Sequence, residues 1–131
     1  MKTNLDMFKN NSVCEEQGIE FEIKPGVSFT LRRFGGKNSN KVKQSLAKHY
    51  KPYARLLETG KMEEEEEKKI MIKVFVDSCL IGWKGIEADG KTLDCNIENA
   101  VNLFMELPEL FDILYKHAND SENYREDLGN F

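Results

Sequence analysis

The sequence has 131 residues, of which 40% are apolar and 32% are charged, and its formal net charge is −4. This size and composition suit a single globular domain and exclude a membrane-spanning helix, because no run of 18 apolar residues occurs. The first residues, MKTNLDMFKNN, lack the apolar stretch and small-residue cleavage site of a secretion signal. We therefore expect a cytosolic protein without a membrane partner.

The charge is unevenly distributed along the chain. Residues 24–61 hold ten Lys and Arg against one Glu, which gives +9, whereas residues 62–131 hold seven against seventeen acids, which gives −10. Such polarity is typical either of a basic binding face or of two halves that neutralise each other. Nucleic-acid binding by the basic part is a minor alternative, since the acidic remainder would be repelled by phosphates.

Residues 1–16 are predicted to form an N-terminal arm, with a short helix at 3–10, ahead of one α+β domain over 17–120. Apolar and polar residues alternate on both sides of Pro25-Gly26, which predicts an antiparallel β-hairpin over 19–34. Its apolar face comprises Ile19, Phe21, Ile23, Val27, Phe29 and Leu31. Because two strands are marginal in water, another part of the chain must cover this face.

A small, mainly helical domain of about four helices is predicted to follow the hairpin. Helical spacing of apolar residues over 39–58 predicts the first helix, which Pro52 should kink or divide near Lys51. The second prediction is a long helix over 62–82 that ends at Gly82, with five glutamates exposed at its start.

Two shorter helices are predicted after a polar turn at Asp89-Gly90. The first covers 96–107 and is capped by Asn96. The second covers 108–118, with Pro108 at its first position. Residues 121–131 are polar and are expected to form a flexible tail.

Trp83, the single tryptophan, lies between Gly82 and Gly85. We interpret Gly82 as a helix stop after which the indole folds back over the helices, with Gly85 letting the backbone pass close beside the ring. The alternative is a partly exposed indole that anchors a binding partner.

No pattern of catalytic, cofactor-binding or metal-ligating residues is visible. The three cysteines are far apart and without a Cys-x-x-Cys pair, so we read them as reduced thiols, with Cys79 buried in a helix. His49 and His117 have no partner in sequence, and the run Glu63–Glu67 is best explained as a solvated helix start. We therefore expect a binding protein that is not an enzyme.

The order of motifs resembles the tail assembly chaperones of long-tailed bacteriophages and prophages. The similarity extends from about residue 17 to 125. Its most specific part comprises Gly82-Trp83-x-Gly85, the Asp89-Gly90 turn, Glu98-Asn99 and Leu107-Pro108-x-Leu110. The KPY and ETG sequences at 51–53 and 58–60 add support. Cys95 departs modestly from the family pattern, in which an aromatic or small polar residue often follows the aspartate at position 94.

The resemblance implies a non-enzymatic role in the cytoplasm of the bacterial host. Such chaperones bind the long helical tape measure protein, prevent its aggregation, help to recruit major tail tube subunits, and are usually absent from the mature virion. The alternative in a related class is a tail or neck component that stays in the particle. Self-association is a further expectation.

An amphipathic client helix would need an apolar groove. We hypothesise that the groove is bordered by large adaptable side chains, with Trp83 as a further contact. The candidates are Met71, Phe75, Phe104, Met105 and Phe111. The competing interpretation is that these residues form the core, since both roles produce the same helical spacing.

Overall fold

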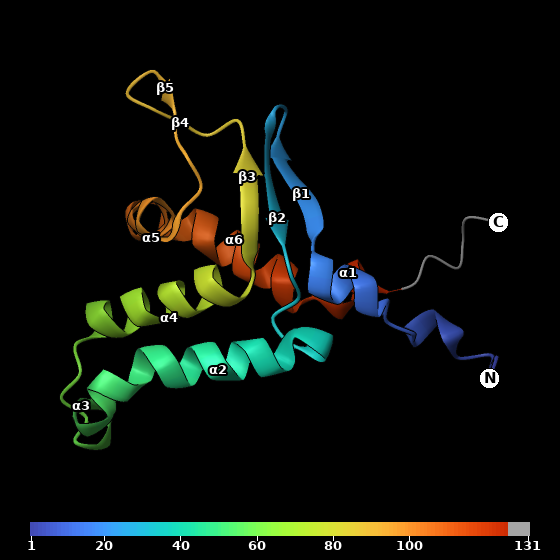
Figure 1. The fold of residues 1–131 in the computed structure, drawn as a ribbon, viewed down its shortest axis with the longest axis horizontal. Coiled ribbons are helices and arrows are strands. Elements are labelled where there is room, and N and C mark those ends of the chain that lie inside the picture. The colour runs from blue at the N-terminus through green and yellow to red at the C-terminus, as the bar shows by residue number, and fades with distance from the viewer. Residues whose placement is uncertain (126–131) are drawn as a thin grey trace.

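The computed structural model describes residues 1–125 of the chain. Its centre is a three-stranded antiparallel sheet flanked by helices (Figure 1). The predicted hairpin is present as β1 (Ile19–Lys24) and β2 (Val27–Leu31), which face each other in the register Phe21–Phe29. The turn between them uses Gly26 at φ +84°, a left-handed conformation that glycine adopts without strain. The α+β class is confirmed.

The prediction of one helix over 62–82 is wrong in its last part, where the structure has a third strand. The helix α4 is shorter, Glu64–Ser78, and the chain then continues as β3 (Leu80–Lys84), which pairs antiparallel with β2. Gly82 is therefore a strand residue opposite Thr30 and ends no helix. The physical reason is that a lone hairpin is marginal, and the third strand, rich in large apolar residues, makes β2 a central strand.

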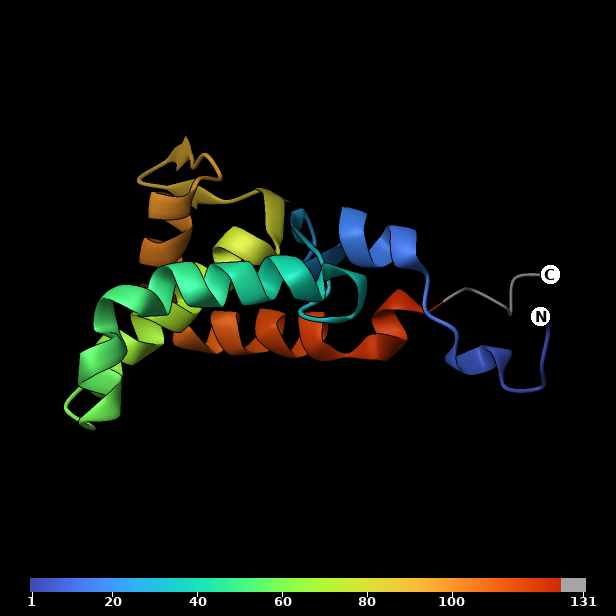
Figure 2. The same cartoon turned by 60° about the horizontal axis from the view of Figure 1, so that its bottom comes forward.

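The first predicted helix is divided next to Pro52, as predicted. Helix α2 (Ser39–Tyr50) is followed by a 3-10 turn, η3 (Lys51–Tyr53), and by the short helix α3 (Ala54–Glu58). Helices α2 and α4 lie side by side in both views of the molecule (Figures 1 and 2). The glutamates at the start of α4 are exposed, as expected for a solvated helix start.

The remaining predicted elements are also present. Asp89 at φ +53° and Gly90 at φ +76° turn a two-stranded hairpin formed by β4 (Glu87–Ala88) and β5 (Lys91–Thr92). Helix α5 (Ile97–Glu106) is capped by Asn96, whose side chain accepts a hydrogen bond from the Asn99 amide. Helix α6 (Pro108–Asn119) begins at Pro108.

Both ends of the domain are more ordered than the sequence suggested. The N-terminal arm contains the 3-10 turn η1 (Asp6–Phe8) in place of a helix over 3–10, and the helix α1 (Ser12–Gln17). After α6, the turn η4 (Ser121–Tyr124) buries Tyr124 completely, and its hydroxyl donates a 3.0 Å hydrogen bond to the Leu31 carbonyl. The predicted flexible tail is thus wrong for 121–125, and residues 126–131 lie outside the described part.

The core lies between the sheet and helices α4, α5 and α6. Aromatic rings form a continuous network through it: the Phe29 and Phe104 centroids are 6.1 Å apart, those of Phe104 and Phe111 5.8 Å, and those of Phe75 and Phe111 5.3 Å. These separations are typical of favourable aromatic pairs. Among the described residues, no helix combines the length and the apolar character that crossing a membrane requires.

Candidate protein-binding cleft

The structure divides the residues predicted to border a client groove into two groups. Phe75 and Phe104 are completely buried and Phe111 is 6% exposed, so these three side chains belong to the core and offer no free surface. Met71, Met105 and Trp83 are half-buried at its edge. For the three phenylalanines the core interpretation is therefore the correct one, and their helical spacing reflects packing.

Trp83 ties the segment after β3 to the sheet. Its indole packs edge-to-face on Phe29 with centroids 6.0 Å apart, and its Nε1–H donates a 2.8 Å hydrogen bond to the Leu93 carbonyl. The Leu93 amide in turn donates to the Ile86 carbonyl. Residues 86–93 therefore form a closed arm that carries the β4–β5 hairpin, which we call the β4–β5 arm.

Gly85 has a different role from the one predicted. It adopts φ +79°, and a Cβ atom there would clash with the carbonyl oxygen of Gly26 in the β1–β2 turn. The close approach is thus to the neighbouring backbone, and the indole plays no part in it. Gly85 allows the chain to leave β3 beside that turn and start the β4–β5 arm.

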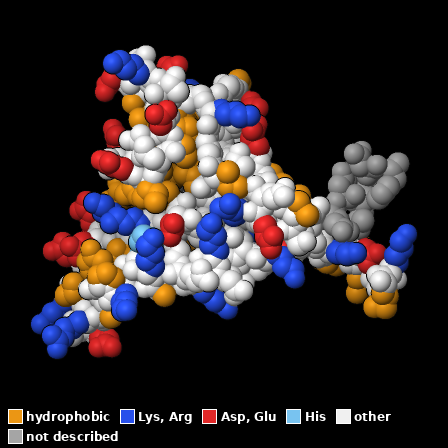
Figure 3. Space-filling view, in the orientation of Figure 1, with side chains coloured by type: hydrophobic (Ala, Val, Ile, Leu, Met, Phe, Trp, Pro, Cys, Tyr) orange, Lys and Arg blue, Asp and Glu red, His pale blue; other side chains and the backbone are white. Residues whose placement is uncertain are grey.

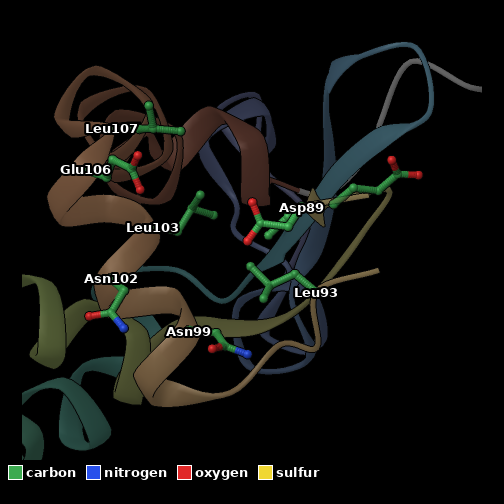
Figure 4. Close-up of a pocket in the computed structure, with 9 residues that line it drawn as sticks. Asp89, Leu93, Asn99, Asn102, Leu103, Glu106 and Leu107 are labelled. Atoms are coloured by element: carbon green, nitrogen blue, oxygen red, sulfur yellow. The ribbon is translucent and has the colours of Figure 1, made fainter. Parts of the chain in front are cut away.

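Between the β4–β5 arm and α5 lies a cleft of about 550 Å³ (Figure 4). Leu93 from the arm and Leu103 and Leu107 from the α5 side supply its apolar lining, and Asn99 and Asn102 add amide groups. Glu87, Asp89 and Glu106 are the charged lining residues, and all three are exposed.

A second hollow of about 450 Å³ adjoins this cleft at the corner between α5 and α6. The two share Glu106 and Leu107, and the second continues along Pro108, Leu110 and Ile113, with Glu109 at its edge. Leu107 and Ile113 are unusually exposed for apolar residues, at 47% and 46%. We call the two hollows together the α5 surface.

The α5 surface combines apolar contacts with a single sign of charge. Four carboxylates line it and neither a Lys nor an Arg does. Figure 3 shows hydrophobic side chains beside acidic ones on this side of the molecule. An apolar hollow with an acidic rim suits an apolar helix face flanked by cationic side chains.

The structure also contains a cluster of polar side chains between α2 and α4. Asp77 accepts hydrogen bonds from Ser45 Oγ at 2.9 Å and from His49 Nε2 at 3.3 Å, so His49, which has no partner in sequence, has one in the fold. Burial raises the pKa of Asp77, but the bonds from Ser45 and His49 and the nearby Lys48 charge outweigh it, so its pKa lies below the usual value. Both donors converge on Asp77, an arrangement that joins two helices.

The cysteines are free and lie in different environments. Cys79 is fully buried, as predicted, and burial raises the pKa of its thiol to about 11. Cys14 is half-buried and Cys95 is exposed. Within residues 1–125 there is no group of three or more His, Cys, Asp or Glu side chains that could hold a metal ion.

The fold is that of a small α+β protein whose α5 surface combines exposed apolar residues with four carboxylates. The profile of the YdaY prophage protein family matches residues 37–128, which is more than half of the chain, and the chain belongs to this family. It is therefore a prophage protein. No curated protein and no solved structure matches it.

Sequence reasoning missed most of the α5 surface. The Asp89-Gly90 turn and the Leu107-Pro108 corner were recognised as motifs, but the placement of the β4–β5 arm against α5 depends on the unpredicted strand β3. The available signal was the surplus of apolar residues at α5 positions outside the buried stripe. Ile97 and Leu103 on α5, and Leu107 directly after it, lie outside the set of buried residues of this helix.

Proposed function

We propose that this prophage protein is a tail assembly chaperone that binds the tape measure protein, keeps it from aggregating and helps to recruit tail tube subunits. Three observations support the proposal: the ordered motifs in the sequence, the membership in a prophage family and the α5 surface. The α5 surface carries most weight, because it provides a place for a client.

The α5 surface suits one amphipathic client helix at a time. Exposed apolar residues at the α5–α6 corner would receive the apolar stripe of a client helix, as in other helix-in-groove complexes. The four carboxylates would then favour client segments that carry Lys or Arg beside the stripe. Such a segment, exposed before assembly, is an aggregation hazard that the contact would remove.

The shape of the surface also suits a temporary complex. One hollow lies between the β4–β5 arm and α5 and the other at the α5–α6 corner, and both are open to solvent, so client release requires no unfolding of the core. Small interfaces of this kind are typical of weak or transient encounters. A chaperone must leave the client when tube subunits polymerise around it, so a modest affinity is consistent with the role.

The decisive experiment is co-purification of the tape measure protein encoded by the same prophage with variants of this chain. Leu107→Asp should abolish recovery of the client, because it places a carboxylate on the apolar contact. This variant should still fold, since Leu107 is 47% exposed and aspartate is favoured at the start of a helix such as α6. Leu56→Asp, at an exposed apolar residue on α3, is the matched control.

Equal recovery of the client by both variants would remove the α5 surface from the interface. Mass spectrometry of purified virions separates the chaperone from the alternative, a structural tail or neck component. A chaperone should be missing from the finished particle. Its presence at stoichiometric amounts would contradict the proposed function.

A further inference from the structure

Helix α2 has an outer face that is basic and polar. Val42 and Ser45 are its buried residues and face α4. The exposed residues of the helix are Asn40, Lys41, Lys43, Gln44, Ala47 and Lys48. Lys37, just before the helix, and Lys51, at its end, are exposed as well, and Figure 3 shows Lys and Arg side chains over this part of the molecule. We call the exposed residues from Lys37 to Lys51 the α2 face.

The positive charge of the α2 face is not neutralised by the part of the chain that the structure describes. Residues 33–57 contain no Asp or Glu, and within residues 1–125 no lysine of the face forms an ion pair with a carboxylate. Asp77, which lies beside α2 on α4, accepts its hydrogen bonds from Ser45 and His49. The lysines therefore remain available to an external anion.

The glutamates of α4 lie away from the first turns of α2, because the two helices run antiparallel. At the start of α2, the Asn38 amide donates a 2.9 Å hydrogen bond to the Ser78 carbonyl at the end of α4. At the other end of α2, burial and then the charge of Glu67 raise the pKa of Tyr50. The beginning of α2 is consequently the part of the α2 face where positive charge is least opposed.

The shape and position of α2 suit insertion into a groove. Figures 1 and 2 both show this helix on the outside of the molecule. Its 12 residues span about 18 Å, and a helix with its side chains is about 10–12 Å across, which matches the width of about 12 Å of the major groove of B-form DNA. A free helix of this size can therefore enter that groove.

The arrangement of side chains around α2 fits the same partner. At helical spacing, Asn40, Gln44 and Ala47 lie along the middle of the exposed face. Lys43 lies on one side of this line and Lys41 on the other, so cations flank the helix where phosphates border a groove. The amides of Asn and Gln are groups that hydrogen-bond to base edges in the major groove.

We propose that α2 docks in the major groove of double-stranded DNA, with the lysines of the α2 face on the phosphates at both sides. A protein partner is less well matched, because Ala47 is the largest exposed apolar residue of α2 and the cores of protein interfaces are poor in lysine. Interfaces with DNA are polar and positively charged. This inference goes beyond the proposed function and uses a different surface.

Fluorescence anisotropy of a labelled 20-base-pair DNA duplex with the full chain, at about 50 to 150 mM salt, tests the proposal. We expect a dissociation constant of roughly 10 μM at the low end of this range, and a slope of log K against log salt of about −4, since each phosphate contact contributes about −0.9. The acidic remainder of the chain limits the affinity, because the net charge is −4.

Lys41→Gln with Lys43→Gln should weaken DNA binding at least about tenfold and reduce the steepness of the salt slope by about 2, because two phosphate contacts are lost. Both side chains are exposed and glutamine forms helices about as well as lysine, so the variant should fold. Lys24→Gln with Lys91→Gln removes the same charge at exposed residues outside the α2 face. It is the matched control and should bind DNA as the wild-type chain does.

An RNA duplex of the same sequence should bind at least about tenfold more weakly, because the major groove of A-form RNA is too narrow for a helix. The proposal would be overturned by absence of DNA binding at about 0.1 mM protein and 50 mM salt, by equal losses in the two variants, or by equal affinity for the RNA duplex. Tighter binding of a glutamate-rich helical peptide than of DNA would make the α2 face a protein-binding surface and would also overturn it. Since no client is present, these outcomes are independent of the chaperone function.

Discussion

At the scale of single residues, Gly85 is the position where backbone geometry constrains the sequence most. Gly85→Ala should destabilise the protein by about 2 kcal/mol or more, because it combines a strained positive φ with a clash against the Gly26 carbonyl. Gly90→Ala, at a positive φ without a neighbour within 4 Å, should cost about 1 kcal/mol. Gly82→Ala, with neither constraint, should be close to neutral. Urea unfolding measures all three, and an equal effect at the three positions would contradict this reasoning.

The buried thiol of Cys79 leads to a prediction about alkaline pH. Burial raises the pKa of this thiol from its ordinary value of 9.0 to about 11, so above pH 9 the unfolded chain loses the proton while the folded chain keeps it. The contribution of this thiol to the free energy of unfolding is therefore complete below pH 9, and the free energy of unfolding falls by about 2–3 kcal/mol as the pH rises to 11. Cys79→Ala should flatten this part of the stability profile in chemical denaturation, whereas Cys95→Ala, at an exposed thiol, should retain most of the slope.

At the scale of elements, Trp83 controls the position of the β4–β5 arm and hence the width of the cleft. Trp83→Phe keeps a ring against Phe29 but removes the donor to the Leu93 carbonyl, which is worth about 1 kcal/mol. We expect faster hydrogen exchange over residues 86–93 and roughly a three- to tenfold weaker affinity for a client helix. Tyr53→Phe on η3 is a suitable control. Unchanged exchange in the arm of Trp83→Phe would show that other contacts hold it.

The elements that sequence reasoning located well are those with a local signal. Pro25-Gly26, Pro52, Asn96 and Pro108 mark a turn, a helix break and two helix starts, and the structure has each of them in place. Strand β3 was missed because its apolar residues continue those of α4 without a break. The free edge of β2, about 50 residues away in the sequence, decides whether such residues form a helix or a strand.

From the sequence, an apolar binding surface could be predicted, but the residues that form it could not. A helical stripe of Met and Phe looks the same whether it faces the core or a partner, and the packing of the sheet against α5 and α6 placed Phe75, Phe104 and Phe111 inside. What remains for a partner are apolar residues beside that stripe, such as Leu107 and Ile113. Their exposure depends on the tertiary arrangement, which no local pattern reports.

At the scale of the whole molecule, the basic and acidic parts of the sequence lie on neighbouring elements of the fold. The basic helix α2 lies along α4, but among the described residues no Lys or Arg of one helix pairs with an acid of the other, and the His49–Asp77 hydrogen bond is the charged-group contact that joins them. The two halves therefore interact mainly through their combined fields and largely keep their charges at the surface. The α5 surface at one end consequently presents a predominantly negative face to its surroundings.

This negative face should select clients by charge. Two helical peptides with the same apolar stripe, one flanked by lysines and the other by glutamates, should differ in affinity by about tenfold or more, the lysine peptide binding more tightly. Raising the salt from about 50 to 500 mM should remove most of the difference, because the Debye length falls from about 14 Å to about 4 Å and the carboxylates are exposed. In the Glu87→Lys, Glu106→Lys variant the preference should shrink or invert, which fluorescence anisotropy of labelled peptides would measure. Equal binding of both peptides at low salt would mean that the acidic rim takes no part in recognition, and that shape and apolar contact alone determine which helices the α5 surface accepts.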